Sequence, residues 1–87
     1  MAAEDLKTKV YNLFKHGYFN GPDDSVTVTD GPDEDIHVVI VSPKLDGLRL
    51  REKNDLIWAE LVNHLEQPEW GKISLSIGVG PAELKTI

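Results

Sequence analysis

Three kinds of side chain in this chain could do acid–base, metal or nucleophilic chemistry: His16, His37 and His64; the run Asp30-Gly-Pro-Asp-Glu-Asp; and Ser42, Ser74 and Ser76. No two histidines have the His-x-x-x-His spacing typical of a mononuclear zinc site. The acidic run lacks the twelve-residue spacing and the terminal Glu of a calcium loop. The serines have no base and orienting acid in a recognisable order. We therefore expect no catalytic residue, no metal site, no cofactor and no enzyme activity.

The lack of cysteine excludes several further kinds of chemistry from this 87-residue chain. Without thiols the chain supplies no disulfide, no thiolate nucleophile and no cysteine ligand for zinc or an iron–sulfur cluster. The first residues contain no apolar signal core, and no apolar run approaches the ~18 residues of a membrane span. We therefore expect a soluble, cytoplasmic protein that does not contact a membrane.

Charge is distributed unevenly along the chain. The net charge is −6, and acids are concentrated between Asp23 and Asp35. Bases are concentrated in the segment that follows, at Lys44, Arg49, Arg51 and Lys53. Two oppositely charged, solvated faces account for this pattern, and so does a docking patch for an acidic partner or a nucleic acid. The negative net charge disfavours binding to phosphate backbones.

The basic segment is the best candidate for a binding surface. If residues 48–55 are helical, Arg49 and Lys53 lie one turn apart on the same face, and Arg51 meets Asp55 in the same way. Trp58 and Trp70 are typical packing residues, but Trp70, in an expected loop, is a candidate for exposure beside the basic patch. The predicted partner- or nucleic-acid-binding residues are Lys44, Arg49, Arg51, Lys53, Asn54 and Trp70.

Helical and strand periodicities place these residues on defined elements. Leu6, Val10, Leu13 and Phe14 follow helical spacing, which predicts a helix over residues 3–16 that stops at Gly17. Alternation in Ser25-Val-Thr-Val-Thr predicts a half-buried strand, and Ile36–Val41 reads as a buried central strand with His37 on its less buried face. The acidic run 30–35 then forms the open tip of a hairpin.

Helical and strand periodicities also occur in the second half of the chain. Leu48-Arg-Leu-Arg is ambiguous between a short helix and an extended link, and an amphipathic helix is expected from about Glu52 to Leu65. Pro68 and Gly71 bound a loop. Ile73-Ser-Leu-Ser-Ile-Gly-Val alternates strictly, which predicts a third strand with Ile73, Leu75, Ile77 and Val79 facing inward. Gly80-Pro-Ala-Glu-Leu predicts a short helical turn that begins at Pro81.

These elements define the expected fold. Each strand has one strongly apolar face, and two amphipathic helices are available to cover it. We predict an α+β fold: a three-stranded sheet with helices packed on one face, in the order α-β-β-α-(α)-β. The length predicts a single domain over residues 1–87.

One stretch is specific enough to indicate a family. Ile36-His-Val-Val-Ile-Val-Ser-Pro-Lys-Leu-Asp-Gly resembles the BolA-like family, whose second strand ends in a Val-Val-Ser-Pro-Lys-Phe-Glu-Gly type of run. Leu56-Ile-Trp with Leu61 is similar to that family's Leu-Val-Tyr…Leu helix. Leu75-Ser-Ile followed by Gly80-Pro-Ala-Glu-Leu is similar to its Leu-Ser-Leu…Thr-Pro-Glu-Glu-Trp close. The resemblance covers the whole chain in element order, and it implies a fold like the type II KH domain.

The resemblance also implies a non-enzymatic binding or regulatory role. BolA-like proteins are partners of monothiol glutaredoxins in iron–sulfur handling, and some are linked to stress response or transcriptional control. In this chain the family's Arg-His-Arg signature reads Lys53-Asn54-Asp55, and its third-strand histidine falls on Ile73. The loop that can carry a ligand in the family is the acidic run 30–35. Iron in such clusters requires thiolate or imidazole.

Two functions follow from the resemblance as expectations. The first is a monomer that docks a protein partner such as a monothiol glutaredoxin, with cluster ligation weakened or lost. The alternative is a KH-like nucleic-acid-binding domain of the transcription-regulator type, which uses the basic patch after the second strand.

Overall fold

Helices and strands alternate along the chain in the computed structural model, which describes residues 4–84. The helices are α1 (Glu4–Lys15), α2 (Leu50–His64), α3 (Gln67–Trp70) and α4 (Pro81–Leu84), and the strands are β1 (Ser25–Asp30), β2 (Ile36–Val41) and β3 (Ile73–Val79). Two 3₁₀ turns, Pro32–Glu34 and Pro43–Leu45, precede and follow β2. The α-β-β-α-β order of the main elements agrees with the sequence prediction.

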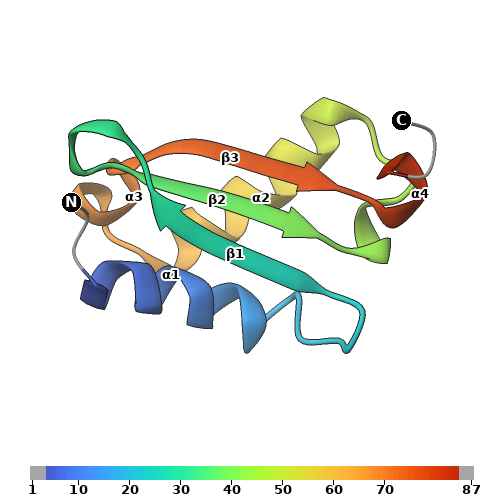
Figure 1. The fold of residues 1–87 in the computed structure, drawn as a ribbon, viewed down its shortest axis with the longest axis horizontal. Coiled ribbons are helices and arrows are strands. Elements are labelled where there is room, and N and C mark those ends of the chain that lie inside the picture. The colour runs from blue at the N-terminus through green and yellow to red at the C-terminus, as the bar shows by residue number, and fades with distance from the viewer. Residues whose placement is uncertain (1–3, 85–87) are drawn as a thin grey trace.

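The three strands form one mixed sheet with β2 in the centre (Figure 1). β1 and β2 are antiparallel neighbours, as expected of a hairpin. β2 and β3 are parallel, because the chain crosses under the sheet through α2 before it returns as β3. The expected central position of Ile36–Val41 is confirmed.

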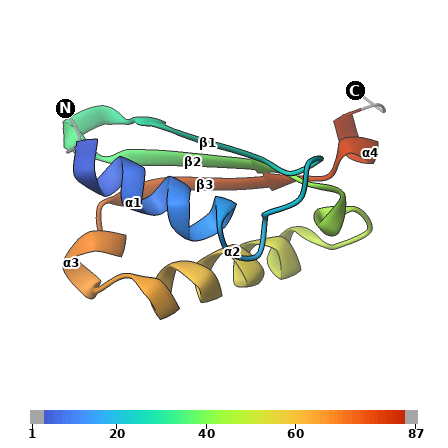
Figure 2. The same ribbon diagram turned by 90° about the horizontal axis from the view of Figure 1, so that it is seen from below.

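Helices α1, α2 and α3 lie on one side of this sheet, and none of the described helices covers the opposite side (Figure 2). The core lies between the two layers. It consists of buried side chains from α1, α2 and all three strands, together with three residues of the connecting segments, Phe19, Leu45 and Leu65: Val10, Phe14, Phe19, Val26, Ile36, Val38, Ile40, Leu45, Ile57, Leu61, Leu65 and Ile73. A helical layer on one face is the arrangement that the apolar stripes predict. This prediction is confirmed.

Helix boundaries follow the expected signals with two differences. Glu4 and Asp5 occupy the first turn of α1, where the helix dipole favours acids, and the helix ends at Lys15, close to the predicted stop. The ambiguous segment 48–51 is not a separate helix, because Leu50 and Arg51 already form the first turn of α2. The expected loop between Pro68 and Gly71 contains the short helix α3, in which the Glu66 N–H donates to Glu69 Oε1 at 3.0 Å.

The inward face of β3 differs from the prediction. Ile73 is buried as expected, but Leu75 and Ile77 are 40% and 39% exposed. The register explains this, since Ile36 pairs with Ile73 whereas His37 pairs with Leu75, so that β3 has one extra residue at this point. A bulge of this kind reverses which alternate residues face the core. Ser76 and Gly78 therefore face the helices, and the prediction that Leu75, Ile77 and Val79 face inward was wrong.

Gly78 shows how closely the helical layer approaches β3. A Cβ atom at this position would lie 2.8 Å from Ile57 Cδ1 and 3.0 Å from Leu45 Cδ1. No side chain larger than hydrogen fits without displacing these two core residues. None of the described helices is long and apolar enough to cross a membrane.

Candidate functional site

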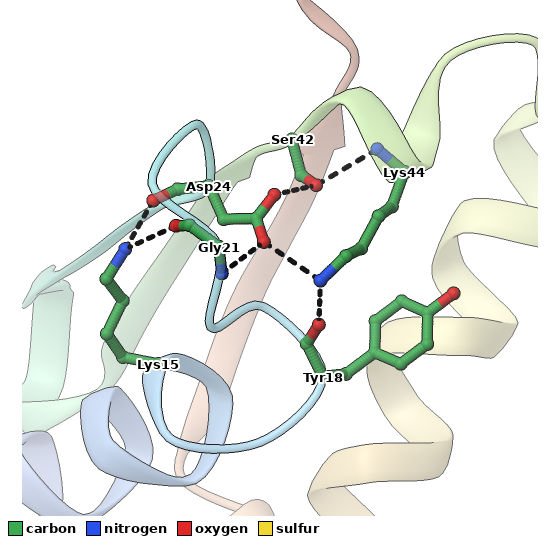
Figure 3. A network of polar contacts seen from close by, with 6 residues as sticks. All are labelled: Lys15, Tyr18, Gly21, Asp24, Ser42 and Lys44. Atoms are coloured by element: carbon green, nitrogen blue, oxygen red, sulfur yellow. Dashed lines mark hydrogen bonds and ion pairs between the residues drawn. The ribbon is translucent and has the colours of Figure 1, made fainter.

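The turn that follows β2 is joined to the α1–β1 loop by a network of polar contacts centred on Asp24 (Figure 3). One carboxylate oxygen of Asp24, Oδ1, accepts from Ser42 Oγ at 2.5 Å. The other oxygen, Oδ2, accepts from Gly21 N at 2.9 Å and from Lys44 Nζ at 2.9 Å. The side chain of Asp24 is only 2% exposed, so these contacts satisfy a carboxylate that burial would otherwise penalise.

Two lysines extend this network to neighbouring backbone carbonyls. Lys15, at the end of α1, donates to the carbonyl oxygen of Asp24 at 2.5 Å. Lys44 Nζ donates to the carbonyl oxygen of Tyr18, and it also lies 5.1 Å from the centre of the Tyr18 ring. The ammonium group of Lys44 is therefore held between a carboxylate, a carbonyl and an aromatic face.

The pKa of Asp24 reflects these contacts. Burial alone would raise the pKa of this carboxyl group, but the hydrogen bonds from Ser42, Lys44 and Gly21, together with the charge of Lys44, outweigh burial. The net result is a pKa below the ordinary value of 3.8. Asp24 is thus an ionised structural group, and its hydrogen bond from Ser42 occupies the only hydroxyl proton of that fully buried serine. Ser42 has no access to a substrate as a nucleophile.

The remaining residues of the turn also have structural roles. Leu45 is fully buried in the core. Asp46 Oδ1 accepts from the Ala82 N–H at 3.1 Å, and so holds the first turn of α4 against the end of the sheet. Gly47 has φ +81°, a backbone conformation that favours glycine. The segment Ser42–Gly47, which carries the most specific part of the family resemblance, is therefore a junction between the α1–β1 loop, the core and α4.

The predicted basic patch does not form one exposed surface. Lys53 is only 6% exposed and lies beneath β3, with its Cβ 3.7 Å from the position that a Cβ of Gly78 would take. Lys44 is engaged by Asp24 and Tyr18. Arg49 and Arg51 are exposed, and the Arg49 N–H donates to Glu52 Oε1 at 2.9 Å at the start of α2. The expectation that Lys44, Arg49 and Lys53 line a common surface is wrong for Lys53.

Trp70 and Asn54 are both half-buried. Trp70 packs edge-on against Trp58, with ring centres 6.1 Å apart and planes at 89°. Trp58 in turn donates its indole N–H to Ser76 Oγ at 3.0 Å. Trp70 therefore belongs to a small aromatic cluster between α2, α3 and β3, and it is half-buried instead of fully exposed.

Two of the candidate metal and acid–base features, His37 and the acidic run 30–35, are neighbours in the structure. His37 lies on the side of the sheet away from the helices, as predicted, and its ring packs against Gly31, where a Cβ atom would meet Nε2 at 2.6 Å. The acidic hairpin tip contains two residues with positive φ, Asp33 at 55° and Glu34 at 65°. Within residues 4–84 no three His, Asp or Glu side chains are grouped so that they could hold a metal ion.

The sequence did not predict that the uncovered side of the sheet carries Leu75, Ile77 and Val79. Its residues alternate with the core residues of each strand, and we call this surface the open face: Ser25, Thr27, Thr29, His37, Val39, Val41, Leu75, Ile77 and Val79. Across the middle of the open face Thr27 pairs with Val39, and Val39 pairs with Ile77. With His37 counted as neutral, none of the nine residues is charged, although Asp, Glu, Lys and Arg make up 28% of the residues of the whole chain. The aliphatic part of the open face lies on β2 and β3, where Leu75 and Ile77 are 40% and 39% exposed. An exposed aliphatic patch without charge is typical of an interaction site.

Comparison of the chain with protein-family models, with curated proteins and with solved structures gives no match. The geometry described above is therefore the basis for a functional proposal.

Proposed function

We propose that this protein is a non-enzymatic protein-binding module of the BolA-like type. The observation that carries the binding role is the open face, where Leu75 and Ile77 are about two-fifths exposed beside the half-buried Val39 and Val41. Burial of aliphatic surface favours association with another protein. Burial of aliphatic surface contributes nothing to the phosphate contacts that dominate binding to nucleic acids.

The BolA-like part of the proposal is supported by element order and by the turn Ser42–Gly47. A parallel β2–β3 pair crossed by α2 and preceded by a β1–β2 hairpin is compatible with a type II KH-like arrangement. The partner class that follows from the resemblance is a monothiol glutaredoxin.

Cluster ligation by this chain is not part of the proposal. Of the two positions where the family carries its signature histidines, one is Ile73, which is 7% exposed and has no donor atom. The other is Asn54, whose neutral amide is a poor ligand for iron in a sulfide cluster. The donor set therefore does not fit an iron–sulfur cluster, and the glutaredoxin is expected to retain its own cluster ligands in the complex.

The nucleic-acid alternative receives less support. Of the four clustered bases, Lys53 is buried and Lys44 is paired with Asp24, which leaves Arg49 and Arg51 at the surface. Two arginines on a chain with a net charge of −6 release few counterions from a nucleic acid. We therefore place this function second.

The experiment is a titration of ¹⁵N-labelled protein with a cluster-free monothiol glutaredoxin, followed by visible circular dichroism of a mixture with the cluster-loaded form. We expect amide shifts on the open face and an unchanged cluster spectrum. The double variant Leu75→Thr/Ile77→Thr should lose the interaction. Val62→Thr on α2, where Val62 is 52% exposed, is the matched control and should retain it. Absence of binding would refute the glutaredoxin partnership, and a spectrum of an imidazole-ligated mixed complex would refute the loss of ligation.

A further inference from the structure

From the shape and charge of the open face we infer that its occupant is a basic amphipathic α-helix of a partner protein. This docking site deepens the function proposed above and rests on it.

The size of the open face suits a single helix. Six residues per strand at ~3.3 Å each give a length of about 20 Å, and three strands ~4.8 Å apart give a width of roughly 14 Å. A helix is ~10–12 Å wide and about 14 of its residues span 20 Å. The footprint of roughly 300 Å² that results is well below the ~800 Å² that each copy contributes to a stable dimer.

The charge around the open face selects a basic occupant over a second copy of the chain. At one end of the sheet the β1–β2 loop presents the exposed Asp33 and the half-buried Asp35, which outnumber the one exposed base that the structure describes there, Lys72. At the other end lie Asp23, just before β1, and Asp46, at the base of α4. Two copies packed face to face would each bring a net charge of −6 to this interface. An amphipathic helix could place its apolar side chains on the uncharged open face. Its lysines or arginines would then contact the aspartates at the two ends of the sheet.

The covered side of the sheet shows that its pleat and twist accept helices. There, α1 contributes Val10 and Phe14, and α2 contributes Ile57 and Leu61, all fully buried against the strands. On the open face β2 and β3 offer aliphatic side chains, whereas β1 offers serine and threonine. Figure 2 shows that the sheet lies between the β1–β2 loop and α4, with no described helix across this side. One added helix would complete a three-layer α–β–α arrangement.

The test uses ¹⁵N-labelled full-length protein and a synthetic peptide of about 14 residues in which leucines follow helical spacing and lysines fill the other positions. We expect the peptide to become helical on binding and to shift the amide signals of Val39, Leu75 and Ile77. Leu75→Thr/Ile77→Thr should weaken binding by about tenfold or more, while Val62→Thr should change it less than about twofold. Threonine keeps a strand-forming side chain and already lines β1, so the double variant is expected to fold.

Three comparison peptides and one measurement on the protein alone make the outcome decisive. A leucine–lysine peptide with strict alternation tests addition of a strand, a scrambled peptide tests charge alone, and a leucine–glutamate helix tests the sign of the charge. If any of these three peptides bound as tightly as the leucine–lysine helical peptide, the inference would be overturned. It would also be overturned if Leu75→Thr/Ile77→Thr did not weaken binding of the helical peptide. Light scattering that shows a dimer abolished by Leu75→Thr/Ile77→Thr would overturn it in favour of a second copy.

The peptide and the glutaredoxin experiments separate the two proposals. Peptide binding without glutaredoxin binding would leave the helix site standing and remove the BolA-type partner. Glutaredoxin binding that depends on Leu75 and Ile77, without peptide binding, would leave the proposed function standing and remove the helix as the occupant.

Discussion

Replacing Asp24 with asparagine tests whether the network in Figure 3 stabilises the fold. The wild-type carboxylate accepts hydrogen bonds from Ser42, Gly21 and Lys44. A buried hydrogen bond to a charged group contributes ~1.5–3 kcal/mol, and removal of one partner of a buried ion pair costs ~3–5 kcal/mol. The Lys44 side chain is 35% exposed, so solvent screens part of the ion-pair contribution. Because asparagine also keeps one acceptor oxygen, we expect the free energy of unfolding to fall by about 2–4 kcal/mol at neutral pH.

The lowered pKa of Asp24 gives this loss a defined pH dependence. Burial acts to raise the pKa, and the hydrogen bonds to the carboxylate lower it below 3.8 in the folded protein. The folded state therefore binds this proton less readily than the unfolded state does. The stabilising contribution of the carboxylate is present above the unfolded-state pKa and is lost as the pH falls through the folded-state pKa. The difference in stability between wild type and Asp24→Asn should accordingly narrow in acid.

Urea unfolding followed by far-ultraviolet circular dichroism at about pH 7 and about pH 3 measures both effects. Asp23→Asn is the matched control, because Asp23 precedes Asp24 in the same loop and is exposed. We expect this control to lie within ~0.5 kcal/mol of wild type. A loss below ~0.5 kcal/mol for Asp24→Asn at pH 7, or a difference from wild type that is the same at both pH values, would refute the reasoning.

Two further substitutions test contacts of β3 with α2, and a binding assay tests the nucleic-acid alternative. Gly78→Ala places a Cβ 2.8 Å from Ile57 Cδ1, and we expect urea unfolding to show a loss of about 1–3 kcal/mol, whereas an unchanged midpoint would contradict the close packing of α2 against β3. Trp58→Phe removes the indole N–H that donates to Ser76 Oγ on β3, and we expect urea unfolding to show that the free energy of unfolding falls by about 1 kcal/mol. An unchanged free energy of unfolding would show that this hydrogen bond does not stabilise the fold. Fluorescence anisotropy with single-stranded DNA at ~50 mM salt should show no binding; binding that Arg49→Glu/Arg51→Glu abolishes would instead establish the nucleic-acid function.

Local periodicity was sufficient to predict the main helices and the three strands of this fold, but not the short helix α3 or the first turn of α2. Apolar residues at helical spacing located α1, and β2 and β3 were predicted with the bounds that the structure has. The phase of β3 was not predictable in the same way, because the extra residue near Ser74 arises from pairing with β2 rather than from any local preference. As a result, a sequence with perfect alternation places Leu75 and Ile77 on the open face instead of in the core.

The candidate site was harder to predict than the fold for a related reason. The sequence showed four bases close together, but whether each reaches solvent depends on what packs on α2, and Lys53 lies under β3. In the sequence Asp24 is only one of several acids between Asp23 and Asp35, and Ser42 is a serine without a recognisable base. Their partnership spans 18 residues and exists only once the α1–β1 loop meets the end of β2. A buried acid next to a turn is a weak sequence signal, since most aspartates in such positions are exposed.

The roles of Ser42–Gly47 have a consequence for how kinship to other proteins is judged from this run. Its serine, lysine, leucine, aspartate and glycine are each fixed by a contact or a backbone angle that the fold itself requires. Selection for a foldable chain is then enough to retain the run during divergence, whatever the surface residues come to bind. A similar run in another chain would be evidence of common architecture, and evidence of a common partner would have to come from the residues of the open face.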